Sequence, residues 1–417
     1  MKGAKENRKA AKNPDLLIAG GGLAGLALAA ILGRAGAMVD VVDPSPAPEP
    51  LKGLIPSGRT VALMESSLNI LRAAGIGDVL ERFGCPLEVM RIIDDSRAQD
   101  EPIVRDFEAN DIGMARFGMN VPNNILRSAL FEAVKGLPNV RLHTGRSVNS
   151  YQPNTQNVRI ELDNGYEIFA KLLAGADGRG SIVRTISGIE THKVEYGQSA
   201  ITCIVNHSRS HSNTATEFHR PGGPLAFVPM TGNQSSIVWI EKTEQAEALI
   251  ALPREAFEQT LQARSANILG GITLESPPEC WPLVSLRARS LKAERTVILA
   301  EAAHVMSPIT AQGLNLSLRD VAALAETVID HLRLGLDPGA ESAIRTFEKR
   351  RTPDVFSRVA WVDFLNRIVA DDKEPVKDLR RAGLKAVSRI APLRHVAMRY
   401  ALAPSVDEGR LAQGLPL

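Results

Sequence analysis

The stretch DLLIAGGGLAG, residues 15–25, joins a short apolar run to a glycine-rich turn. Residues 15–19, which are continuously apolar after Asp15, have the character of a short strand buried in a parallel sheet. The turn that follows matches G-x-G-x-x-G. Residues 26–34, rich in Ala and Leu, are predicted to form a helix, and residues 38–42 a second strand that runs into Asp43. This order of strand, turn, helix and strand predicts a Rossmann-type α/β domain.

The three glycines of the turn each have a physical role in binding a dinucleotide. Gly20 permits the tight turn, Gly22 lets the backbone approach a pyrophosphate, and Gly25 lets the helix pack against the strand. The helix N-terminus offers free N–H groups to the phosphates, and Asp43 can accept hydrogen bonds from ribose hydroxyls. The unit predicts a dinucleotide site, but it does not distinguish NAD from FAD. The alternative is that these glycines serve helix packing alone.

The composition is typical of a soluble globular enzyme. Of the 417 residues, 44% are apolar and 23% are charged, which allows two or three domains with large cores. The net charge of +2 gives no reason to expect a nucleic-acid partner. The sparse cysteines, Cys85, Cys203 and Cys280, indicate free thiols in a reducing compartment. We therefore expect a cytoplasmic protein with no metal site and no disulfide framework.

The N-terminal region does not indicate secretion or a membrane span. Residues 1–13 are polar and are expected to form a disordered tail, with no signal peptide after them. Residues 16–33 carry no charge and are long enough to cross a membrane. A membrane helix is the less favoured interpretation, because this stretch divides into a strand and a glycine turn.

Two later segments also place a loop directly after a buried strand. Residues 171–176 are predicted to be a strand and run into Asp177-Gly178. Residues 296–300 are predicted to be a strand that leads into EAAH, residues 301–304. After a loop, the segment PITAQGLN, residues 308–315, precedes a helix that is predicted to end near residue 329.

These motifs resemble the group A flavoprotein aromatic hydroxylases, the family of p-hydroxybenzoate hydroxylase. The branch that they most resemble is that of the ubiquinone-biosynthesis hydroxylases, which act on polyprenylated phenols. The resemblance covers residues 14–370 in order. Further matching segments are RTVAL at residues 59–63, VPNNILR at 121–127, FHRPGGPLAFVP at 218–229 and WPL at 281–283.

The resemblance implies that FAD is the cofactor and gives roles to matching residues. Asp177 would lie by the pyrophosphate and the route of the nicotinamide donor, Glu301 by the ribityl chain, and Pro308 near the reactive edge of the isoalloxazine. Two arginines would face the cofactor, and the backbone of three consecutive residues would meet the flavin pyrimidine. These residues are Arg59 and Arg127, and Gly313, Leu314 and Asn315.

The implied activity is hydroxylation of the ring of a polyprenyl phenol in ubiquinone biosynthesis. NAD(P)H would reduce the FAD, the reduced flavin would form a C4a-hydroperoxide with O₂, and the phenol would take the distal oxygen. No residue is predicted as a base for the phenol. The alternatives left open are an FAD-dependent reductase, another aromatic hydroxylase on the same fold, and a flavin-binding scaffold subunit of a biosynthetic complex.

The sequence departs from the family pattern at two places. The usual G-D-A-A-H is here AEAAH, residues 300–304, and the usual G-Q-G is AQG, residues 311–313. Glu301 keeps the carboxylate on a longer side chain, so we expect its contact with the ribityl chain to shift. His304 is interpreted as a packed or hydrogen-bonded loop histidine rather than a catalytic base.

The expected fold class is α/β, with a Rossmann-type FAD-binding domain, a mixed β-sheet substrate domain and C-terminal helices. The FAD-binding domain is expected to be discontinuous, and the remaining chain is divided between the other two parts. The expected bounds are 14–80, 120–185 and 280–335 for the FAD-binding domain, 81–119 and 186–279 for the substrate domain, and 336–417 for the helical region.

Residues 378–400 alternate apolar and basic side chains. Such a segment is typical either of a helix on an anionic membrane surface or of a helix that covers the core, and the second interpretation is favoured. An enzyme for a membrane-dissolved lipid must approach the bilayer, so peripheral contact with the inner face of a membrane is a further expectation. Assembly into a homo-oligomer or a biosynthetic complex is the default expectation for partners.

Overall fold

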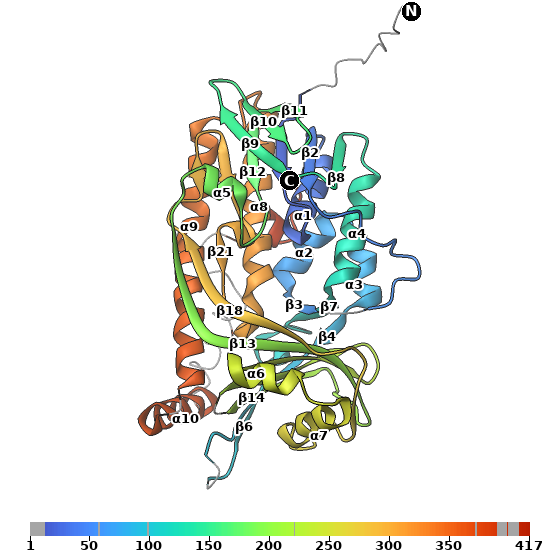
Figure 1. Cartoon of the computed structure of the whole chain (residues 1–417), viewed down its shortest axis with the longest axis vertical. Coiled ribbons are helices and arrows are strands. Elements are labelled where there is room, and N and C mark those ends of the chain that lie inside the picture. The colour runs from blue at the N-terminus through green and yellow to red at the C-terminus, as the bar shows by residue number, and fades with distance from the viewer. Residues whose placement is uncertain are drawn as a thin grey trace, which may run out of the picture.

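The computed structural model describes residues 13–56, 59–97, 100–220, 222–371, 373–389, 398 and 408–417. The predicted disordered tail lies outside these ranges, apart from its last residue. Two large sheets, two three-stranded sheets, one of which lies between the large ones, and surrounding helices make up the described chain (Figure 1). This architecture confirms the predicted α/β fold class.

A six-stranded sheet forms around the N-terminal strand. All of its strand pairs are parallel except the pair at one edge, β19–β20. The central strand β1 is fully buried, which explains its continuous apolar sequence. The strands in spatial order are β19 (Lys292–Ala293), β20 (Thr296–Ile298), β12 (Leu172–Gly175), β1 (Leu16–Ala19), β2 (Val39–Asp43) and β8 (Val140–Thr144).

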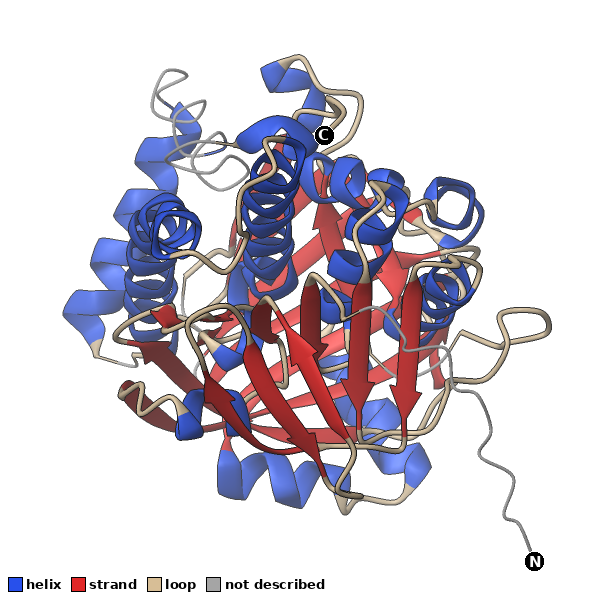
Figure 2. Ribbon diagram, turned by 90° about the horizontal axis from the view of Figure 1, so that it is seen from above, coloured by secondary structure: helices blue, strands red, loops and turns tan. Residues whose placement is uncertain are grey.

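Helices lie over this sheet (Figure 2), and three of them pack side by side, because α1 contacts both of the others. The three are α1 (Leu23–Arg34), α4 (Asn123–Lys135) and α8 (Gln312–Arg333). A three-stranded antiparallel sheet of β9 (Val148–Pro153), β10 (Val158–Leu162) and β11 (Glu167–Ala170) adds apolar side chains to the same core. The uncharged stretch 16–33 is thus a buried strand, a turn and a helix. No helix in the described ranges is long and apolar enough to span a membrane.

A nine-stranded sheet forms the second large layer and has its own core around Trp239. In spatial order its strands are β21 (His304–Val305), β18 (Glu279–Ala288), β13 (Thr191–His207), β16 (Gln234–Lys242), β15 (Gly223–Met230), β14 (Thr214–Arg220), β5 (Val89–Asp94) and β6 (Ile103–Glu108), with β17 (Ile272–Leu274) paired to β13. The helices α6 (Thr243–Ile250) and α7 (Arg254–Arg264) pack on it.

A small sheet connects the two large ones. It consists of β3 (Thr60–Met64), β7 (Gly118–Pro122) and β4 (Cys85–Leu87), and the helices α2 (Glu65–Ala73) and α3 (Gly77–Phe83) pack beside it. Asn120 on β7 donates a buried hydrogen bond to the carbonyl oxygen of Pro229 on β15 at 2.9 Å. This contact fixes the small sheet against the nine-stranded one.

The C-terminal helices complete the fold. The long helix α9 (Glu341–Ala370) packs along α8 and forms the left margin of the molecule in Figure 1, with α10 (Glu374–Arg389) at its foot. The short helix α12 (Gly409–Ala412) packs on α2 and α8. Two arginines hold α10 in place, because the buried side chains of Arg380 and Arg381 both contact the fully buried carboxylate of Asp94.

Candidate functional site

A cavity of about 660 Å³ lies where the six-stranded and nine-stranded sheets approach each other. Its wall includes the glycine-rich turn after β1, the loops after β12 and β20, the first turn of α8 and the inner face of the nine-stranded sheet. The volume is within the range of small-molecule and cofactor sites. The cavity therefore brings together the three loops that the sequence places directly after buried strands.

The three motif glycines do different things in the turn. Gly20 has a φ of +112°, and a Cβ there would lie 2.2 Å from the carbonyl oxygen of Ala176. A Cβ on Gly25 would lie 1.9 Å from the carbonyl oxygen of Gly20, so this glycine lets α1 pack against the turn. A Cβ on Gly22 would meet nothing within 4 Å, and this residue lines the cavity. Gly20 and Gly25 shape the turn, while Gly22 leaves its backbone open to a ligand.

Asp43 ends β2 directly beside the turn. Its carboxylate accepts hydrogen bonds from the backbone N–H of Gly21 at 2.5 Å and of Ser45 at 2.8 Å. The guanidinium of Arg127 lies 3.9 Å from the same carboxylate and lines the cavity. Asp43 at the end of β2 and Arg127 on α4 thus place a carboxylate and a cation together beside the glycine turn.

The Asp177 side chain is engaged by its own loop. Its carboxylate accepts hydrogen bonds from the Ser181 hydroxyl at 2.5 Å and from the backbone N–H groups of Ile182 and Val183 at 2.8 and 3.1 Å. These N–H groups begin the short helix α5 (Ile182–Ile186). Asp177 therefore stabilises the loop, and the cavity wall is formed by its neighbour Gly178.

Arg184 joins this loop to the one that follows β20. Its guanidinium donates to the carbonyl oxygens of Arg179 and Ala302, both at 2.8 Å. Glu301 lies at the cavity wall with about half of its side chain exposed, 3.4 Å from the guanidinium of Arg179. The carboxylate of Glu301 is therefore available at the solvent side of the cavity.

The segment 308–315 forms the opposite part of the wall. Pro308, Gly313 and Leu314 line the cavity, and α8 begins at Gln312. Asn315 is fully buried instead: it accepts a hydrogen bond from the backbone N–H of Met64 at 2.9 Å and donates to the carbonyl oxygen of Ala62 at 2.8 Å. The Asn315 side chain thereby fastens the start of α8 to β3.

Beneath this wall lies a buried charge network that the sequence did not reveal. His304 Nε2 lies 2.6 Å from Asp320 Oδ2. The same oxygen accepts a hydrogen bond from the backbone N–H of Ala300 at 3.0 Å. Arg351 on α9 donates to the other Asp320 oxygen at 2.7 Å. Burial alone would raise the pKa of Asp320, but His304 and Arg351 outweigh it and lower the pKa to about 2. His304 is therefore buried and hydrogen-bonded, as interpreted from the sequence, but it begins the short strand β21 and does not lie in a loop.

The only sequence signal for this network is a pair of charges, Arg319-Asp320, inside the apolar run of α8. Their partners lie on α9, more than 30 residues further along the chain. A charge in a buried helix indicates that a partner exists, but it does not say where that partner is.

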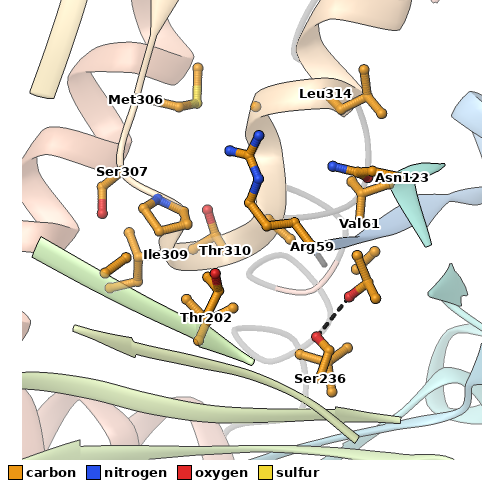
Figure 3. Close-up of a pocket in the computed structure, with 18 of the residues that line it drawn as sticks. Arg59, Val61, Asn123, Thr202, Ser236, Met306, Ser307, Ile309, Thr310 and Leu314 are labelled. Carbon is orange, nitrogen blue, oxygen red and sulfur yellow. Dashed lines mark hydrogen bonds between the residues drawn. The ribbon is translucent and has the colours of Figure 1, made fainter. Parts of the chain in front are cut away.

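The remaining wall combines apolar side chains with hydroxyl groups. Arg59 extends into the cavity (Figure 3), and its guanidinium lies 4.6 Å from the ring centre of Trp281. Thr60 on β3 donates a hydrogen bond to the Ser236 hydroxyl on β16 at 2.7 Å, across the base of the cavity (Figure 3). Apolar atoms dominate the rest of the cavity wall, which includes Met306 and Ile309. Such a surface suits an aromatic or aliphatic ligand.

Known proteins of one family are similar to this chain over most of its length. The FAD binding domain family matches residues 13–360. The ubiquinone hydroxylase UbiL of Rhodospirillum rubrum is 36% identical over 97% of this chain and 94% of its own length. The 3-demethoxyubiquinol 3-hydroxylase of Escherichia coli is 27% identical over 93% of this chain and 98% of its own length.

Two solved structures share the fold. PqsL of P. aeruginosa, solved in complex with 2-aminobenzoylacetate, superposes with a TM-score of 0.76 over 90% of this chain and all of its own, at 24% identity. A single-residue variant of HpxO from Klebsiella pneumoniae, solved with FAD, has a TM-score of 0.74 over 93% of this chain and 98% of its own, at 16% identity. At these identities the likeness concerns the fold alone.

Proposed function

Since this chain belongs to the FAD-dependent monooxygenases, in their ubiquinone-hydroxylase branch, we propose that it hydroxylates the aromatic ring of a polyprenyl phenol during ubiquinone biosynthesis. One observation carries the proposal: a single cavity runs from the open glycine turn at Gly22 to an apolar end at Met306 and Ile309. A dinucleotide site and a site for an apolar ring are therefore continuous.

The residues around the cavity fit FAD. Gly22 leaves open space where any side chain would otherwise stand against a pyrophosphate, and the first turn of α1 offers N–H groups beside it. Asp43 is positioned for the ribose hydroxyls, and Arg127 for the phosphates. The first turn of α8 offers further N–H groups, and this helix end stabilises an anion by about 0.3–2 kcal/mol, depending on burial.

Further residues are assigned to the cofactor in this proposal. Glu301 holds the ribityl chain from the solvent side, and Pro308 lies near the reactive edge of the isoalloxazine. The backbone at Gly313 and Leu314 meets the pyrimidine ring, with Asn315 holding that backbone in place. Asp177 acts indirectly, because its carboxylate shapes the loop that carries Gly178.

When bound, FAD accepts reducing equivalents from NAD(P)H and activates O₂ for transfer to the ring. The chain itself positions the phenol and keeps water out. The apolar side chains of Met306 and Ile309 pack on the ring or its prenyl tail, and the guanidinium of Arg59, which lines the cavity, stabilises an anionic ligand there. The domain division stays a proposal, with the cofactor on the six-stranded sheet and the phenol against the nine-stranded one, although β18 and β21, which fall within the expected FAD-binding range 280–335, are strands of the nine-stranded sheet.

The test is mass spectrometry of quinone-pool lipids in cells that lack the gene and have no redundant hydroxylase. We expect a prenyl phenol one oxygen short to accumulate and to disappear when the intact chain is supplied. Gly22→Asp should not restore the profile, because its carboxylate would stand in the space proposed for the pyrophosphate. The matched control is Gly383→Asp, which also has open space around its Cβ but lies on α10, and it should restore the profile.

An unchanged quinone profile in the deletion cells would remove the ubiquinone assignment. Restoration by Gly22→Asp would remove the proposed place of the pyrophosphate. With the purified protein, uptake of labelled oxygen into a soluble phenol at the expense of NAD(P)H distinguishes hydroxylation from simple reduction.

We also propose peripheral contact with a membrane, because a polyprenyl phenol is dissolved in one. The basic segment 378–400 supports this contact less directly than its sequence suggested. The side chains of Arg380 and Arg381 are buried against Asp94, and residues 390–397, 399 and 400 lie outside the described ranges. The surface that we propose for this contact lies on α9 instead.

A further inference from the structure

The most exposed edge of α9 is apolar in its middle. Residues spaced three or four apart lie on one side of a helix, and one such row of α9 is exposed to solvent along five turns. We call this row the α9 ridge. Its members are Lys349, Pro353, Phe356, Ala360, Phe364 and Arg367.

The exposure of the two phenylalanines is unusual for a surface helix. Phe356 and Phe364 are 54% and 53% exposed, at positions where a helix on a globular protein normally carries polar residues. Trp361 lies next to the ridge, with its ring centre 5.7 Å from that of Phe364. The opposite side of α9 already supplies the core contacts, through Val355, Val359 and Val362. Among the described residues, the ridge is therefore apolar surface that lies outside the hydrophobic core.

The charges around the ridge are positive. Lys349 and Arg367 stand at its two ends, and the guanidinium of Arg287 lies 4.5 Å from the ring centre of Phe356. The nearby carboxylate of Asp363 is engaged by the hydroxyl of Tyr196. An apolar centre between long cationic side chains suits an interface with anionic head groups, where the rings enter the acyl boundary and the cations reach the phosphates.

The ridge is also close to the cavity. The valines on the inner side of α9 pack against Met306 and Ile309, which line the apolar end of the cavity. The ridge is thus separated from the cavity wall by the thickness of one helix, about 10–12 Å. A surface that touched the ridge would lie beside the part of the site proposed for the ring and its tail.

We propose that the α9 ridge docks on the surface of an anionic lipid bilayer. This inference rests on the proposed function, because a membrane-dissolved substrate is what docking would serve. A second copy of the chain fits the ridge less well. Both ends of the ridge are cationic, so that parallel and antiparallel pairing of two ridges would each bring like charges together.

The test is flotation of the full-length, FAD-loaded protein with vesicles of phosphatidylcholine containing phosphatidylglycerol. The double variant Phe356→Ser/Phe364→Ser should bind these vesicles about tenfold or more weakly than the original protein, because two half-exposed rings lose their burial in the bilayer. Arg367→Glu should weaken binding to the same vesicles and leave the small residual binding to pure phosphatidylcholine unchanged. The matched control is Leu336→Ser, 52% exposed in the α8–α9 loop, which should bind as the original does.

Equal flotation of the double variant, or an equal loss in Leu336→Ser, would overturn the proposal. So would a change of oligomeric state in the double variant without any change in vesicle binding, since the ridge would then join copies of the chain. Oxidation of NAD(P)H with a short, water-soluble phenol should be the same in all variants. That assay reports on the proposed hydroxylase, so failure of the activity and failure of docking are distinguishable.

Discussion

Ala300 and Ala311 occupy backbone conformations that favour glycine. Their φ angles are +55° and +52°, and both residues lie at the cavity wall. They are also the two positions at which the sequence departs from the glycines of the family motifs. An L-residue in this left-handed region is disfavoured by roughly 1–2 kcal/mol. Alanine at these two positions therefore carries an energetic cost, which the packing around both loops must offset.

Ala300→Gly and Ala311→Gly should each leave the free energy of unfolding unchanged or raise it, by up to about 1 kcal/mol. The relief of strain exceeds or balances the added entropy of glycine in the unfolded chain. Ala360→Gly on the exposed side of α9 is the control, and it should lower the free energy of unfolding by about 1 kcal/mol. Urea denaturation of the three variants checks this. Equal destabilisation by all three would contradict strain at the loop positions.

The motif glycines should separate folding from cofactor binding. Gly25→Ala should lower the free energy of unfolding by about 1–3 kcal/mol, because its Cβ would collide with the Gly20 carbonyl oxygen. Gly22→Asp should fold with nearly the original stability in the absence of FAD, because its side chain has open space, and it should lose most of its FAD affinity. Denaturation of the apoprotein and fluorescence titration with FAD measure the two effects. A Gly22→Asp protein that binds FAD normally would be inconsistent with this division.

At the scale of elements, α8 is the helix on which the site depends. Its first turn lines the cavity, Asn315 ties it to β3, and Asp320 ties it both to the segment of Ala300 and His304 and to Arg351 on α9. The segment of Ala300 and His304, the helix α8 and the helix α9 are thus all joined through one buried carboxylate, that of Asp320. Since α9 also carries the ridge, the same contacts fix the ridge relative to the cavity.

Asp320→Asn should lower the free energy of unfolding by about 3–5 kcal/mol at neutral pH, because the buried Arg351 then keeps only Asp354, a carboxylate that it shares with Arg319. The folded-state pKa of about 2 lies below the ordinary Asp value of about 3.9. The stabilisation by this carboxylate is therefore complete above pH 4 and is lost as the pH falls toward 2. Denaturation curves of both proteins should converge over that range.

Asp330→Asn is the control on the same helix. Asp330 is largely exposed and pairs with Arg410, so its replacement should cost less than about 1 kcal/mol. A loss as large in Asp330→Asn as in Asp320→Asn would mean that burial of the carboxylate is not the cause.

At the scale of the whole molecule, the cavity is formed jointly by parts that are far apart in the chain. Direct polar contacts between the small sheet and the nine-stranded sheet are the Thr60–Ser236 and Asn120–Pro229 hydrogen bonds. A ligand that fills the cavity contacts the loops of the six-stranded sheet and the face of the nine-stranded sheet at once. Its binding should therefore stabilise both layers together rather than one of them.

FAD should therefore raise the midpoint of a single thermal transition. At a free FAD concentration one hundred times its dissociation constant, the gain in unfolding free energy is about 2.7 kcal/mol. Calorimetry of the FAD-loaded and FAD-stripped protein measures the shift, and Gly22→Asp should show none. Two separate transitions, only one of them sensitive to FAD, would mean that the two layers unfold independently.

The sequence alone was sufficient for the fold class, the FAD cofactor and the family. These properties depend on short motifs, such as the turn at Gly20–Gly25, in which each residue acts on neighbours a few positions away or on the ligand itself. The predicted strand 15–19 and the helix after Gln312 appear as β1 and α8 for the same reason, since local pattern and burial agree there.

Three other features required the folded chain. Asp177 serves its own loop, Asp320 is paired with Arg351, and α10 is held through Asp94 rather than lying free as a basic helix. Each depends on which side chains meet after the chain has folded, and in the last two the partners are distant in sequence. The α9 ridge belongs here as well, because a 3.6-residue period shows that a row of residues shares one side of a helix, while packing decides which side faces the core and which remains at the surface.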